Sequence, residues 1–194
     1  YIMCKTNIAI EILKDDLNTQ VASVDLQNAI FIENGEELCC LSKIIISGDY
    51  CREYTVASHV LKLDNNRILL DGKLLLVVLW SELAIIDIEQ NKLLNVLNFN
   101  SWELFGVYKF KSGYFLHGED STRFLNGNFN LLWESGCVNI FVNYKTNCEV
   151  QIFNGYFTIL DWYGHNHFYD ENGELTSVYC PQYDCNKNDG ENSA

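Results

Sequence analysis

Ile85-Ile-Asp-Ile-Glu-Gln-Asn-Lys-Leu93 is an alternating apolar run, a two-residue turn and the start of another run. Similar text recurs at Ala29-Ile-Phe-Ile-Glu-Asn-Gly-Glu-Glu-Leu38, Arg123-Phe-Leu-Asn-Gly-Asn-Phe129 and His167-Phe-Tyr-Asp-Glu-Asn-Gly-Glu-Leu175. Asn-Gly between apolar runs favours a tight β-hairpin, because both central residues of a type I′ turn need positive φ. The four copies therefore predict four hairpins of one kind.

A second series of turns runs in phase with the first. Its members are Asp71-Gly72, Ser112-Gly113 and Asn154-Gly155, spaced by about 42 residues. Each precedes a turn of the first series, and projecting the offset backwards predicts one more turn within residues 14–18, between strands at 7–13 and 21–24. Each unit is thus expected to hold two hairpins, that is, four antiparallel strands.

The turns also set the expected boundaries. One all-β domain is expected over residues 1–180, with four repeats at about 5–43, 58–99, 102–136 and 137–180. The first interval is long in both series, so residues 44–57 are expected as an insertion between the first two repeats. Residues 181–194 are polar and rich in turn formers, and we expect a weakly ordered tail there.

Four-stranded repeats with a period near 42 are the pattern of β-propeller blades. The fragment Glu82–Leu94 resembles the inner hairpin of such blades. This resemblance implies either a four-bladed ring or an open arc similar to part of a larger propeller. The recurring combination of Gly-His and Trp-Asp that marks WD repeats is absent from the sequence, as are the double glycines of kelch repeats. A β-sandwich with a meander is the alternative.

Composition narrows the class of partner. The chain has 26 acidic and 13 basic residues and a formal net charge of −13. Such a surface repels phosphate groups, which argues against nucleic acid and anionic membranes as partners. A basic protein is the natural complement, although the charge alone would also serve solubility.

Eight cysteines raise the question of disulfides. A chain of 194 residues can bury a core, and several cysteines lie in strand-like runs, so we expect reduced thiols and a cytoplasmic location. The longest apolar run, Leu74–Trp80, is far too short to cross a bilayer. The N-terminal residues do not have the pattern of a signal peptide.

The most crowded polar segment is 161–171. His165 and His167 would share one face of a strand and could share a metal, to which Cys180 and Cys185 could add ligands. The alternative is that the histidines cap a loop, and no Cys-x-x-Cys spacing supports zinc. Motifs for nucleophilic catalysis and for binding phosphate are lacking, so we expect no enzyme, no cofactor and no metal.

By size, acidity and lack of catalytic motifs, the chain resembles bacterial toxin-immunity proteins of the contact-dependent inhibition type. That resemblance implies a basic, nuclease-like cognate toxin whose active site is occluded. Aromatic and acidic residues near strand ends, Trp102, Glu103 and Trp133 among them, are natural anchors. The expected partner-binding residues are Glu119, Asp120, Glu134, Asp161, Trp162, Tyr163, His165, Asp170 and Glu171. A propeller-type scaffold or ligand-binding module and a propeller-based hydrolase or lyase are the alternatives.

Overall fold

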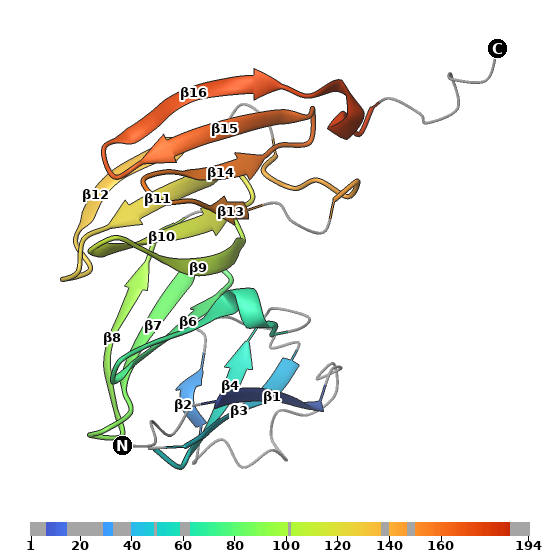
Figure 1. Cartoon of the computed structure of the whole chain (residues 1–194). Helices are drawn as coiled ribbons and strands as arrows, with labels where there is room; N and C mark the ends of the chain where they lie inside the picture. Colours follow the sequence, from blue (N-terminus) through green and yellow to red (C-terminus); the bar gives the residue numbers. More distant parts are fainter. Residues whose placement is uncertain are drawn as a thin grey trace. The chain divides into compact units, whose positions relative to one another are not determined.

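The computed structural model describes residues 7–14, 29–32, 40–48, 50–58, 63–100, 102–136, 140–146 and 150–186. Within these ranges the chain forms β-strands and short 3-10 helices, and no α-helix. The strands make four sheets of four strands each, which confirms the predicted all-β fold (Figure 1). The chain divides into two compact units, residues 1–100 and 101–194, and each unit is described by itself.

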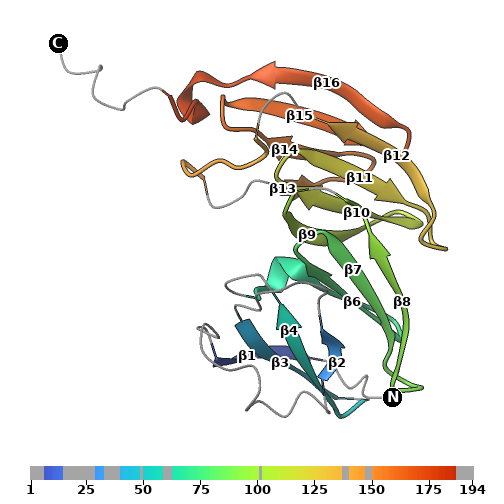
Figure 2. The same ribbon diagram turned by 180° about the vertical axis from the view of Figure 1, so that it is seen from behind.

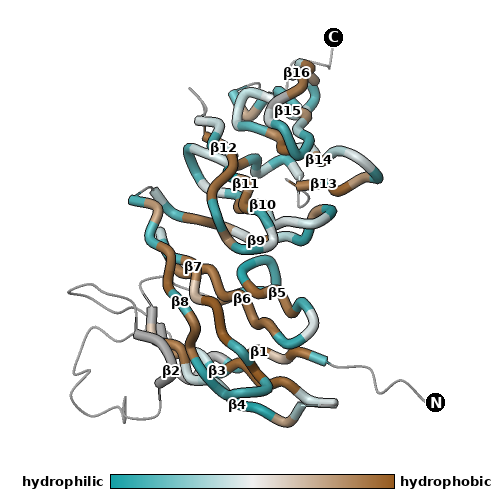
Figure 3. Tube along the Cα trace, turned by 90° about the vertical axis from the view of Figure 1, so that its left-hand side faces the viewer, coloured by the Kyte–Doolittle hydropathy of each residue, from teal (hydrophilic) through white to brown (hydrophobic). Residues whose placement is uncertain are grey.

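The second sheet follows the predicted succession of hairpins. It consists of β5 (Ile68–Asp71), β6 (Leu74–Leu79), β7 (Glu82–Asp87) and β8 (Lys92–Asn98), in chain order. Gly72 has a φ of +60° and Asn91 a φ of +53°, so both predicted turns of this unit adopt the left-handed conformation that the sequence indicates. β7 is buried along its whole length, and apolar stretches run through this sheet in Figure 3.

The first sheet differs from the prediction. Its strands β1 (Asn7–Lys14), β2 (Ala29–Ile32), β3 (Cys40–Ser47) and β4 (Arg52–Ser58) have the order β1-β3-β4-β2, with β2 parallel to β4. Residues 44–57, expected as an insertion, supply half of β3 and nearly all of β4. The reason is a period of two, since Ile44, Ile46, Tyr54 and Val56 are all buried. The predicted turns after Lys14 and at Asn34-Gly35 lie outside the described residues.

The core of the first unit joins its two sheets. Ile44, Ile46 and Tyr54 of the first sheet belong to one buried cluster with Leu75 and Val77 of the second. Burying such side chains removes apolar surface from water, which is the main driving force of folding. Between the sheets, the Arg52 Nε–H also donates to the Ile88 carbonyl at 3.0 Å.

The second unit holds two antiparallel meanders (Figures 1 and 2). The third sheet consists of β9 (Leu104–Phe110), β10 (Gly113–Gly118), β11 (Ser121–Leu125) and β12 (Leu131–Gly136). The fourth consists of β13 (Val150–Ile152), β14 (Phe157–Leu160), β15 (His165–Asp170) and β16 (Gly173–Tyr179). The structure confirms the hairpins predicted at Asn126-Gly127, Asn154-Gly155 and Asn172-Gly173. It also confirms the hairpin near Ser112-Gly113, in which Lys111 is the residue with positive φ.

Aromatic rings form the core of the second unit. The rings of Phe115 and Phe157 stack with centroids 4.0 Å apart, which packs the third sheet against the fourth. Trp133 stacks on Phe124 and on Tyr169, and its Nε1–H donates to the Glu171 carbonyl at 3.0 Å. Large rings bury much apolar area each, so a few of them account for most of this core.

Antiparallel pairing gives this unit two ends. The tight turns β9–β10, β11–β12 and β15–β16 lie at one, which we call the turn end. We call the other end the loop end. It holds two loops, β10–β11 at 118–121 and β14–β15 at 161–164, and the segments 140–146 and 180–186.

Candidate functional site

Backbone hydrogen bonds connect the segments of the loop end. The Glu119 N–H donates to the Glu103 carbonyl at 2.8 Å, and the Phe141 N–H donates to the Glu119 carbonyl at 2.8 Å. The Trp162 N–H then donates to the Ile140 carbonyl at 2.9 Å. Residues 140 and 141 therefore tie the β10–β11 loop of the third sheet to the β14–β15 loop of the fourth.

Side chains of the segment 140–146 hold the C-terminal segment in place. The buried Asn143 Nδ2 donates to the Asp161 carbonyl at 2.6 Å and to the Tyr183 carbonyl at 2.8 Å. The Tyr144 hydroxyl donates to the Cys185 carbonyl at 2.7 Å. Because an unpaired buried amide or carbonyl is costly, these bonds fix both segments together.

The C-terminal segment also packs closely on Gly164. This glycine has a φ of +80°, and a Cβ there would lie 2.7 Å from both the Cys180 carbonyl oxygen and the Asp184 nitrogen. Residues 181–186, expected as the start of a weakly ordered tail, thus form the short helix η4 (Pro181–Tyr183) and pack against the loop end. Residues 187–194 lie outside the described residues.

A buried carboxylate organises the β14–β15 loop. Asp161 is 0% exposed, and its Oδ1 accepts the His165 backbone N–H at 2.8 Å. Its Oδ2 lies 3.2 Å from His167 Nε2 and 3.4 Å from His165 Nδ1. The two histidines therefore share one face, as the sequence predicts, and they meet a carboxylate that closes the loop.

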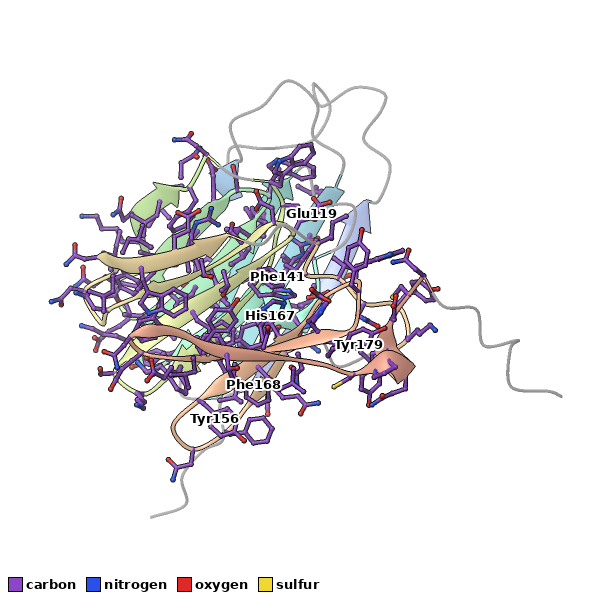
Figure 4. All side chains as sticks on the ribbon, turned by 90° about the horizontal axis from the view of Figure 1, so that it is seen from above. Glu119, Phe141, Tyr156, His167, Phe168 and Tyr179 are labelled. Atoms are coloured by element: carbon purple, nitrogen blue, oxygen red, sulfur yellow. The ribbon has the colours of Figure 1, made fainter. Side chains whose placement is uncertain are left out.

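The interior beneath this loop is aromatic. The Phe141 ring meets the His167 ring edge-on with centroids 5.4 Å apart, and Figure 4 shows the two side by side. His117 is buried, and its Nε2 lies 2.8 Å from the Phe141 carbonyl oxygen. On the opposite face of the fourth sheet, Phe168 packs against Tyr156 (Figure 4).

Exposed apolar side chains gather at the loop end. Tyr144 is 62% exposed, Tyr163 44%, Tyr179 42% and Tyr183 37%, and Ile140 is 45% exposed. Tyrosine offers a large apolar area, a polar hydroxyl and few rotatable bonds, which is why it is enriched in binding surfaces. The loop end therefore has the composition of a protein interface.

The same region is acidic. In the segments of the loop end, Asp161 and Asp184 are acidic and Lys145 is basic, whereas Asp170, Glu171 and Glu174 lie near the turn end. The β10–β11 loop adds Glu119 and Asp120. The field over the exposed tyrosines is consequently negative and attracts cations.

The predicted site residues divide into three groups. Those at the loop end are Glu119, Asp120, Asp161, Trp162, Tyr163 and His165, together with Trp102 and Glu103. Asp170 and Glu171 lie at the turn end, where Glu171 pairs with Lys111 at 3.1 Å. Glu134 lies on β12 and pairs with Arg123 at 2.7 Å, while Trp133 packs in the core. Because Asp161 is buried, its carboxylate supports the loop rather than facing a partner.

Four exposed residues of the loop end were missed from the sequence: Ile140, Tyr144, Tyr179 and Tyr183. Tyr144 ends the alternating run Val138-Asn-Ile-Phe-Val-Asn-Tyr144, which favours a strand rather than a loop, and Tyr183 lies in the stretch expected as a tail. Long-range contacts bring these residues to one place: those of Asn143 and Gly164, the Trp162–Ile140 backbone bond and the bond from Tyr144 to Cys185. The one sequence signal that could have indicated these residues was the number of tyrosines close to these loops.

Within the described ranges, no group of three or more His, Cys, Asp or Glu side chains is arranged to hold a metal ion. Cys51, Cys180 and Cys185 are free thiols. None of the helical segments in the described part of the chain has the length and apolar character needed to cross a membrane.

No protein-family model and no curated protein matches this sequence. Solved structures with a similar fold include the computationally designed Ika8 protein, with a TM-score of 0.52 and 8% identity over 75% of this chain and 47% of that one. BamB from Moraxella catarrhalis has a TM-score of 0.51 and 12% identity over 77% of this chain and 52% of its own. The chain spans about half the length of these structures. At such identities the likeness shows the fold alone, which is propeller-like.

Proposed function

We propose that this protein is an acidic protein-binding inhibitor that binds its partner with the loop end of the second unit. The partner is a basic, nuclease-like toxin domain whose active site is occluded, and the protein acts in the cytoplasm as a bacterial immunity protein does. The observation that carries the proposal is the cluster of exposed tyrosines on loops that lie in an acidic stretch of the chain.

Charge would control the rate of encounter. A formal net charge of −13 attracts a basic partner, and electrostatic steering raises association rates by about 10- to 1000-fold at low salt. The segment 150–186, with no lysine or arginine, would be approached first. A site shaped for nucleic acid is cationic, so an acidic surface can compete for it.

Tyrosines would hold the complex after encounter. Hot-spot residues at interfaces are enriched in Tyr and Trp, and truncating one typically costs about 2 kcal/mol or more. Tyr163 fits this role because it is 44% exposed and follows Trp162, whose backbone is anchored to residue 140. Loops already fixed by backbone hydrogen bonds need little further ordering on binding.

The test is co-expression with the products of adjacent genes, above all a larger protein with a basic C-terminal domain. We expect a complex that co-purifies and whose affinity falls as salt concentration rises. Tyr163→Ala should weaken binding at least 10-fold. Leu132→Ala, which changes a 56% exposed residue of β12, is the matched control and should bind like the wild type.

The proposal would be overturned by the absence of any complex at micromolar concentration. It would also be overturned if Tyr163→Ala and Leu132→Ala bound a captured partner equally well. The second result would move the binding surface away from the loop end.

A second function, a propeller-type scaffold or ligand-binding module, is favoured by one observation. The chain spans about half the length of the propeller-like structures that it matches. A module of this kind would bind its ligand equally well at low and high salt if charge plays no part. Salt dependence of a captured complex therefore separates the two proposals.

A further inference from the structure

β16 lies at the open edge of the fourth sheet. The strand order is β13-β14-β15-β16, and among the described strands β16 pairs only with β15 (Figures 1 and 2). Leu175 is 58% exposed, Val178 49% and Tyr179 42%. Side chains on both faces of this strand are thus accessible, as for a strand that lacks its next neighbour.

The outer strand β8 has Lys92 at its start, whereas β12 and β16 each contain a single glutamate, Glu134 and Glu174. β16 contains neither lysine nor proline, and its last four residues, Thr176–Tyr179, contain no charge. Charges and proline are the devices by which native edge strands avoid pairing with other chains. β16 therefore presents an unprotected edge.

The ladder with β15 shows which stretch of this edge is regular. The register shift lies near the β15–β16 turn, and residues 176–179 pair without interruption with 165–168. The Cys180 N–H donates towards β15, to the Gly164 carbonyl at 2.7 Å. Because backbone groups alternate in direction along an antiparallel strand, the N–H and C=O of Ser177 point to the outer edge.

We infer that the outer edge of β16 binds an extended basic segment of a partner protein as an added β-strand. The inference rests on the proposed function for the charge of that partner. Main-chain hydrogen bonds would supply affinity, and exposed side chains such as Val178 would select alternating apolar residues. A lysine or arginine at the end of the segment nearest the β15–β16 turn would lie near the carboxylates of Asp170 and of Glu171, the second of which also pairs with Lys111.

Charge favours this occupant over a second copy of the chain. Two copies would bring together strands from a segment that has acidic residues and no basic ones, on molecules that each carry a formal charge of −13. Like charges held together in this way destabilise the complex. A basic segment has the opposite effect, and its affinity should fall with salt.

The experiment uses the full chain and a fluorescent peptide of alternating valine and threonine with a lysine at each end. We expect saturable binding at low salt. Replacing the end lysines by glutamate, or N-methylating alternate backbone amides, should weaken it at least 10-fold. Ser177→Pro removes an outward N–H and should do the same, because proline is tolerated where the N–H faces away from the sheet. Ser177→Thr is the matched control and should bind normally.

The inference fails if the N-methylated peptide binds as well as the parent peptide, or if no saturation is reached at millimolar peptide. The peptide comparison uses wild-type protein, so it is decisive even if Ser177→Pro does not fold. A chain that sediments as a dimer, and becomes a monomer on Ser177→Pro substitution, would show that a second copy fills the edge. Tyr163→Ala should leave peptide binding intact, so failure here and failure of the loop-end proposal are distinguishable.

Discussion

Replacing Asp161 by alanine tests whether the buried carboxylate holds the loop end together. The side chain is 0% exposed and accepts the His165 N–H at 2.8 Å, with His167 Nε2 at 3.2 Å from its other oxygen. Alanine would leave the His165 N–H and the His167 ring nitrogen facing a small cavity. The β14–β15 loop and the segments bonded to it should loosen together.

The magnitude follows from the groups left without a partner. A buried polar group that loses its partner costs about 1–3 kcal/mol, and the two groups closest to the carboxylate are affected, so Asp161→Ala should lose about 2–6 kcal/mol. Asp161→Asn is the matched control. Its carbonyl oxygen can still accept the His165 N–H, and the contacts of the second oxygen with the His167 and His165 rings are changed, so it should lose about 1–3 kcal/mol.

Urea denaturation followed by tryptophan fluorescence measures this loss. Trp102, Trp133 and Trp162 belong to the second unit and Trp80 to the first, so the signal reports mainly on the unit that is changed. A loss below about 0.5 kcal/mol for Asp161→Ala, within the usual range of surface changes, would refute the reasoning. An equal loss for alanine and asparagine would show that the hydrogen bond to His165 contributes nothing.

Three further changes have defined outcomes. Gly164→Ala should lower the free energy of unfolding of the second unit by at least about 2 kcal/mol in denaturant titrations, because a Cβ there meets backbone atoms at 2.7 Å. Gly72→Ala is the control: a Cβ there has nothing within 4 Å, so the first unit should lose only the roughly 1–2 kcal/mol that a non-glycine residue costs at a positive φ. Burial raises the pKa of the Tyr54 phenol, so its contribution is present below the ordinary pKa of about 10 and is lost as pH rises through the raised value; Tyr54→Phe should flatten the alkaline limb of a melting-temperature profile. The Gln90 N–H lowers the pKa of Asp87, so this contribution is present above about pH 4 and is lost as pH falls through the lowered value; Asp87→Asn should flatten the acid limb of the same profile. A mutant profile parallel to that of the wild type would contradict either pH prediction.

Local signals made most of the fold predictable. The turns at Gly72, Asn91 and Gly155 have positive φ, and residues that tolerate this conformation mark them in the sequence. Their spacing predicted the strands and the order of the second, third and fourth sheets. Such turns connect neighbours in the chain, so no long-range information was needed.

The first sheet was less predictable because its pairing is not local. β1 pairs with β3 across residues 15–39, and β2 pairs in parallel with β4. A period-two pattern such as Ile44 and Ile46 predicts a strand but does not name its partner. The spacing of turns therefore led us to expect an insertion where two paired strands lie.

The candidate site could be predicted from the sequence only in part, again because some of its contacts are not local. Acidic and aromatic residues at strand ends, such as Glu119 and Trp162, were predicted to lie in binding loops, and they lie at the loop end. The burial of Asp161 and the docking of Tyr183 depend on Asn143, which is 18 and 40 residues away along the chain. Sequence patterns of short range carry no signal of such contacts.

The bonds that join residues 103, 119, 140, 141 and 162 run from backbone amide to backbone carbonyl. They form whichever side chains the loops carry, proline excepted. The exposed side chains of Tyr163 and Tyr183 are therefore free to vary without dismantling the support beneath them. A lineage could exchange these positions to follow a changing partner, and a laboratory library could randomise them on the same frame.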